Sequence, residues 1–150
     1  MYSPDDISFR SQTMTVEKLL AGMRDGHIDF KRQDYDSFTS SAYIESVIIG
    51  LPLLPIVFDG SKAPWRIIDG SKRLQIIWDF AFNRFRLDDA SFYHMPEHLY
   101  FDEMNPYLKN RFFKAVVPCY IINPGTPPDV IYEIRKRIRT DLSIGYKKYL

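Results

Sequence analysis

A short stretch from Trp65 to Phe80, WRIIDGSKRLQIIWDF, brings together an apolar run, an Asp-Gly pair and two basic residues. The apolar run at 67–68 is typical of a strand, and the spacing of apolar residues after Arg73 is typical of a helix. The stretch therefore predicts a turn from a strand into a helix. The polar residues of that turn either bind an anion or only shape the chain.

The residue types in this turn are suited to binding a phosphate. Backbone N–H groups at the start of a helix attract anions, and the helix dipole adds to the attraction. Gly70 would let the backbone approach a ligand closely. Ser71 offers a hydroxyl, while Lys72 and Arg73 offer positive charge, and Arg73 could hold one phosphate through two donors. Asp69 could orient a water, a metal ion or a ribose hydroxyl.

The same turn has an ordinary structural explanation. Asp-Gly pairs commonly precede helices, and Asp69 could simply cap the helix that follows. Lys72 and Arg73 could then lie in solvent. On the local pattern alone, this explanation is favoured over ligand binding.

Length and composition indicate a single globular domain of 1–150. The 150 residues are 45% hydrophobic and 15% aromatic, which is enough for a substantial core. A net charge of +1, from 20 basic and 19 acidic residues, gives no whole-protein argument for nucleic acid. The C-terminal segment 130–150 is nevertheless basic and contains tyrosines, so it could follow a DNA backbone or be a solvated helix face. Its basic residues are Arg135, Lys136, Arg137, Arg139, Lys147 and Lys148.

Cysteine and histidine usage gives no sign of a disulfide or a metal site. Cys119 is the one cysteine, and we expect it to be a small buried residue. Pro96 lies between His94 and His98, which disfavours a helix that presents both to a metal. The N-terminus lacks the basic start and apolar core of a signal peptide, and no apolar run approaches the ~20 residues of a membrane span. We therefore expect a cytoplasmic protein without membrane contact.

Hydrophobic periodicity predicts a mixed α/β domain with a small sheet. Helices are expected over 15–26, 38–50, 71–82, 105–115 and 127–139. Strands are expected over 54–60 and 64–69, which could pair as a hairpin, and over 116–122. Pro118 interrupts the last of these, so we expect an edge or bulged strand there. Trp65 and Trp78 are expected in the core.

Three segments fall in an order that is similar to a known family. The first is Phe-x-Arg at Phe30 and Arg32; the second is YIESVIIGLPLLP at 43–55; the third is Asp-Gly-x-x-Arg-Leu at 69–74. Together they resemble the N-terminal domain of the GmrSD-type restriction endonucleases, in the ParB/sulfiredoxin-like superfamily. The resemblance extends over about Val16 to Thr140 and is most specific in the middle third.

This resemblance implies a ParB/sulfiredoxin-like fold, with a small mixed sheet surrounded by helices. It also implies binding of an NTP, with Mg²⁺ as the accompanying ion, by a bacterial protein that restricts phage DNA. Asp69 and Arg73 would then be catalytic. The nucleotide-binding positions would be Arg32, Glu45, Gly70, Ser71, Lys72 and Arg73. We expect Arg73 and Arg32 to share one cleft with the first turn of the helix, and Glu45 either to orient one of these arginines or to lie on the rim.

The chain departs from the family at positions that matter for turnover. The signature has two glutamines where this chain has Ser71 and Lys72, and the family's Thr is Gln75. The family's Arg-Ile-Asn-Thr-Gly corresponds to 137–141, where the Asn and the Gly are absent, and we expect a domain truncated at its C-terminus. We therefore expect retained phosphate binding with weak or no NTP hydrolysis and no nuclease activity. The alternative is a degenerate, non-catalytic module that binds DNA or a protein partner; the oligomeric state stays open.

Overall fold

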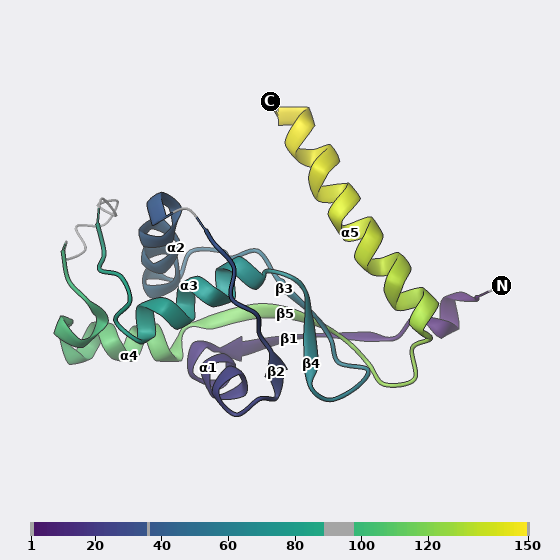
Figure 1. The fold of residues 1–150 in the computed structure, drawn as a ribbon, viewed down its shortest axis with the longest axis horizontal. Coiled ribbons are helices and arrows are strands. Elements are labelled where there is room, and N and C mark those ends of the chain that lie inside the picture. Colours follow the sequence, from purple (N-terminus) through teal and green to yellow (C-terminus); the bar gives the residue numbers. More distant parts are fainter. Residues whose placement is uncertain (1, 36, 89–97, 150) are drawn as a thin grey trace.

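The computed structural model describes residues 2–35, 37–88 and 98–149, with the side chains of 37–39 and 139–149 left out of the description (Figure 1). The chain forms the mixed α/β domain that the sequence predicts, with helices around one five-stranded sheet. The elements are β1 (Phe9–Thr15), α1 (Val16–Arg24), β2 (Ile28–Asp29), α2 (Ser37–Ile49), β3 (Ile56–Asp59), β4 (Trp65–Asp69), α3 (Ser71–Ala81), α4 (Pro106–Lys114), β5 (Val116–Ile122) and α5 (Pro128–Tyr149), with short 3₁₀ turns at Pro4–Asp6 and Phe101–Glu103.

The sheet is mixed and has the strand order β1-β5-β3-β4-β2. The predicted hairpin is confirmed, because β3 and β4 pair antiparallel. The prediction of an edge strand at 116–122 is wrong: β5 lies between β1, which is antiparallel to it, and β3, which is parallel. Pro118 is tolerated because pairing with β3 begins only at Cys119, so Pro118 has a neighbouring strand on one side alone.

Polar residues set the helix ends as the sequence suggests. The Thr15 hydroxyl accepts a hydrogen bond from the Lys18 N–H at the start of α1. Asn105 caps α4 by accepting from the Leu108 N–H, and Pro106 occupies the first turn. These contacts confirm two predicted helix starts.

One face of the sheet carries the main core, built with α1, α2, α3 and α4. Ile56, Phe58 and Ile121 alternate onto this face and are fully buried. Leu74, Ile77 and Phe80 of α3 pack against them and are also 0% exposed. Cys119 belongs to this core, and burial raises the pKa of its thiol to about 11. Trp65 and Trp78 pack against the core from partly buried positions.

The opposite face is covered by α5 alone among the described helices. Val57, Ile68 and Ile122 point to this face and form a second, smaller apolar cluster. The helix α5 packs on them through Ile131, Ile134 and Ile138. Beyond this contact α5 runs outward, and its C-terminal end stands away from the rest of the ribbon in Figure 1. Within the described residues, no helix combines the length and apolar character needed to cross a bilayer.

Candidate functional site

The strand-to-helix turn at 69–73 has a backbone that requires glycine. Gly70 has φ of 101° and occupies the N-cap of α3. A Cβ at this position would also collide with the side chain of Ile56. Asp69 therefore does not cap the helix, because the N-cap residue is Gly70 and has no side chain to accept from the first turn. The first N–H groups of α3 are left without a side-chain cap.

Asp69 and Arg73, the two expected catalytic residues, lie in contact with each other. The Arg73 Nη2 donates to the Asp69 carboxylate over 3.1 Å. The Arg73 Nη1 donates to the backbone carbonyls of Leu54 and Pro55 over 2.6 and 3.1 Å. The guanidinium thus ties the segment before β3 to the turn that begins α3. We name this set of contacts the Arg73 clamp.

Ser71 and Lys72 are the two polar side chains of this turn that take no part in the Arg73 clamp. Ser71 is partly exposed and the Lys72 side chain is exposed. Neither side chain is engaged by a hydrogen bond or an ion pair within the described part of the chain. An anion at this helix start would therefore meet backbone N–H groups, the Ser71 hydroxyl and the exposed Lys72 ammonium group.

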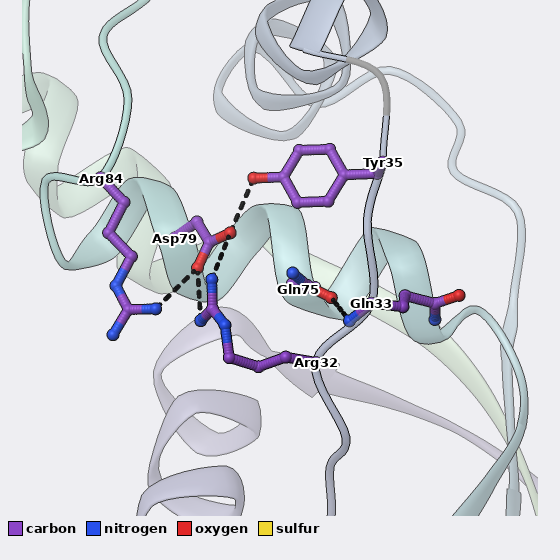
Figure 2. A network of polar contacts seen from close by, with 6 residues as sticks. All are labelled: Arg32, Gln33, Tyr35, Gln75, Asp79 and Arg84. Atoms are coloured by element: carbon purple, nitrogen blue, oxygen red, sulfur yellow. Dashed lines mark hydrogen bonds and ion pairs between the residues drawn. The ribbon is translucent and has the colours of Figure 1, made fainter.

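The structure places Arg32 away from the Arg73 clamp, which corrects the expected common cleft. Its guanidinium pairs with Asp79, six residues beyond Arg73, through distances of 3.0 and 3.4 Å (Figure 2). The hydroxyl of Tyr35 donates to the same carboxylate over 2.7 Å, and Arg84 lies 3.6 Å from it. Asp79 is only 3% exposed, and these partners offset the cost of burying its carboxylate.

This Asp79 network fixes the extended segment 30–35 on α3. The Gln75 side chain adds to it by accepting from the Gln33 N–H over 2.8 Å. Burial, and then the hydrogen bond to Asp79, raise the pKa of Tyr35 well above its usual range. Sequence reasoning missed Asp79. The signal was a single acidic residue inside the apolar run IIWDFAF, since a buried carboxylate requires a cationic partner.

Glu45 is buried on α2, with 4% of its surface exposed, so the expectation of a rim position is wrong. The two arginines that Glu45 was expected to orient have other acidic partners: Arg32 pairs with Asp79, and Arg73 pairs with Asp69.

Tyr43 lies two residues before Glu45 on the same helix. Its hydroxyl is buried without a hydrogen-bond partner in the described residues, and burial raises the pKa of Tyr43 to about 12.

The predicted basic segment is partly visible on α5. Arg135, Lys136 and Arg137 lie on the first half of the helix, where Arg137 pairs with Glu133 over 2.9 Å. The side chains of Arg139, Lys147 and Lys148 lie outside the described residues, and so does His94. Across 2–35, 37–88 and 98–138, no group of three or more His, Cys, Asp or Glu side chains is arranged to hold a metal.

Comparison with known proteins does not extend this description: no family model, no curated protein and no solved structure matches the chain.

Proposed function

We propose that this chain is a ParB-like phosphate-binding domain that holds the phosphate of a nucleotide at the N-terminus of α3. The class of protein follows from the sequence resemblance to GmrSD-type restriction proteins, which act on DNA with NTP and Mg²⁺. Retained binding with little or no turnover is the form of that activity which the geometry supports best.

The uncapped first turn of α3 carries the proposal. Gly70 leaves the first N–H groups of the helix without a side-chain acceptor, at the positive end of the helix dipole. Lys72 adds an exposed charge at the same turn, and no described carboxylate pairs with it. These groups stabilise an anion in the ground state.

The Arg73 clamp argues against efficient turnover. Phosphoryl transfer needs an oriented water and a cation that follows the developing charge. Asp69 and Arg73 already engage each other, and Arg73 also holds two backbone carbonyls. Lys72 can donate but cannot accept a hydrogen bond, so it cannot replace a glutamine that orients water.

A thermal-shift titration with pyrophosphate, ATP and GTP, each with and without Mg²⁺, tests the proposal. A ligand at ~100 times its Kd stabilises the fold by ~2.7 kcal/mol. We expect Lys72→Glu to remove most of that shift, because it reverses the charge at an exposed position. Lys18→Ala, an exposed substitution on α1, is the matched control and should keep the shift. No shift with any of these ligands, or an equal shift in Lys72→Glu, would rule the site out.

An apolar groove favours a second candidate, a non-catalytic module that binds a protein partner. The groove has a volume of about 460 Å³ and runs along one flank of α5 on the open face of the sheet. Exposed apolar side chains line it, namely Ile7, Phe9, Leu54 and Tyr120, with Leu54 66% exposed. Apolar surface of this kind marks protein-binding sites. Light scattering across a concentration series tests self-association, which Leu54→Glu should abolish if a second copy is the partner.

A further inference from the structure

A second hollow lies on the other flank of α5, between the β3–β4 hairpin and the start of the helix. It has a volume of about 630 Å³, within the ordinary range of ligand pockets. The lining comes from the hairpin (Asp59, Ser61, Lys62, Pro64), from Arg66 of β4, and from the segment 125–135. We name it the hairpin pocket. It lies at the opposite end of β4 from Gly70, roughly 13 Å along the strand by the usual rise per residue.

Three cations from three different segments line the hairpin pocket: Lys62, Arg66 and Arg135. None of them has an ion pair or a hydrogen bond from its side chain in the described part of the chain. The lining also includes one carboxylate, Asp59, which accepts hydrogen bonds from the N–H and the hydroxyl of Ser61. With three cations and one carboxylate, the lining carries a formal net charge of +2.

Since like charges repel, an anion shared by these three cations would lower the electrostatic energy of the hollow. Arg66 and Arg135 each offer a planar fork of donors that fits phosphate oxygens. Pro127 and Pro128 also line the pocket, so the positive end of the 22-residue helix α5 faces the same hollow.

The pocket also offers an aromatic surface beside the charges. Tyr132 is one of its lining residues and is 69% exposed. An exposed ring next to arginines is the combination that stacks a nucleobase while the cations hold its phosphate. Inorganic phosphate would use only the charges, whereas a nucleotide unit would use both features.

We propose that the hairpin pocket binds a nucleotide unit, with its phosphate on Lys62, Arg66 and Arg135 and its base stacked on Tyr132. The unit comes either from a free mononucleotide or from single-stranded nucleic acid, which present the same chemistry. This site is separate from the first turn of α3 and does not depend on phosphate binding there.

Fluorescence anisotropy with a labelled single-stranded oligonucleotide of about ten residues tests the proposal, with AMP and inorganic phosphate as unlabelled competitors. The triple variant Lys62→Ala/Arg66→Ala/Arg135→Ala should weaken binding at least tenfold. Each single-strand phosphate contact contributes about 0.7 to the slope of log K against log salt, so the variant should lower that slope by about 2. Lys18→Ala on α1 removes a charge behind the opposite face of the sheet and should leave affinity unchanged.

Tyr132 provides the test of base stacking. Tyr132→Ala should weaken binding, whereas Tyr132→Phe should keep it, because the ring rather than the hydroxyl makes the contact. The variants are expected to fold, since Lys62, Arg66 and Tyr132 are exposed; circular dichroism and the Tm check this.

Competition identifies the source of the nucleotide. Full displacement by AMP assigns the pocket to free nucleotides, and displacement only by unlabelled strand assigns it to nucleic acid. Equal affinity of the wild type and the triple variant, or no binding of any probe by the wild type, overturns the proposal. Lys72→Glu should leave strand binding at the hairpin pocket unchanged, which keeps this result distinct from failure of the α3 site.

Discussion

The guanidinium group of Arg73 makes polar contacts with three acceptors in this domain. Arg73 neutralises the partly buried Asp69 and satisfies the carbonyls of Leu54 and Pro55. Removing it would leave acceptors unpaired, at a cost of about 1–3 kcal/mol in the free energy of unfolding. We therefore expect Arg73→Ala to destabilise the fold by this amount. Urea denaturation measures the change.

Arg73→Lys serves as the control for geometry at this position. A lysine keeps the charge but lacks the fork that reaches three acceptors, so it should recover only part of the lost stability. A loss below ~0.5 kcal/mol in Arg73→Ala, the range of an ordinary surface substitution, would contradict a structural role for the clamp.

Two partly buried tyrosines, Tyr35 and Tyr43, make stability depend on alkaline pH. The pKa of Tyr43 is raised to about 12 by burial, and that of Tyr35 is raised further by burial and by Asp79. In the unfolded chain both lose their protons near pH 10, so above this pH the native state holds more protons. Stability from these groups is therefore complete below pH 10 and falls as pH rises beyond it.

The Tm measured from pH 8 to 11.5 checks this dependence. The wild type should lose Tm above pH 10 more steeply than Tyr43→Phe or Tyr35→Phe, which lack one titrating group each. Tyr132→Phe is the control, because Tyr132 is exposed and should not alter the profile. Parallel profiles in all four proteins would show that the titration of neither Tyr35 nor Tyr43 is linked to folding.

At the scale of elements, the sequence predicted helices better than strands. Periodicity and caps such as Thr15 and Asn105 are local signals, so α1 and α4 were found with their starts. β1 was missed because most of it is exposed and polar, and it pairs with β5 far along the chain. The interior position of β5 was missed for the same reason: the register that accommodates Pro118 depends on where β3 begins.

The candidate site shows the same division between local and distant information. Asp69, Gly70 and Arg73 lie within one turn of chain, so the sequence grouped them in one motif, although it did not predict the ion pair between Asp69 and Arg73. The pairing of Arg32 with Asp79 joins residues that are 47 positions apart. The sequence contains Arg32 and, inside an apolar run, Asp79, but it does not indicate that the two are close in space, so their ion pair was not predicted.

The helix α5 should detach without unfolding the domain. It is held by Ile131, Ile134 and Ile138 on a small cluster, while the main core lies on the other face of the sheet. Ile134→Asp places a charge against that cluster and should speed hydrogen exchange in α5 while α3 stays protected. Tyr132→Asp, at an exposed position of the same helix, is the control. Global loss of protection would show instead that α5 is required for the fold.

At the scale of the molecule, the two faces of the sheet differ: one carries the main core, and the other carries the groove and the pocket beside α5. The face covered by α1 to α4 carries the main hydrophobic core. The face under α5 stays open on both flanks of that helix, with an apolar groove on one side and the hairpin pocket on the other. Since binding surfaces need accessible groups, we expect partners and ligands to approach from the α5 face and from the first turn of α3.

The whole chain should bind phosphate without converting it. Lys72 can strengthen ground-state binding, but equal binding of substrate and transition state does not raise the rate of the chemical step. Asp69 and Arg73 are held by each other, and Ser71 and Lys72 replace the glutamines of the resembled signature. We expect no NTP hydrolysis above background and no DNA cleavage, measured by phosphate release and by plasmid nicking with Mg²⁺.

Ser71→Gln combined with Lys72→Gln should increase hydrolysis if the remaining site is competent. Robust Mg²⁺-dependent turnover by the unmodified chain, lost in a correctly folded Asp69→Asn variant, would show that the Arg73 clamp opens during catalysis and that the domain is an enzyme.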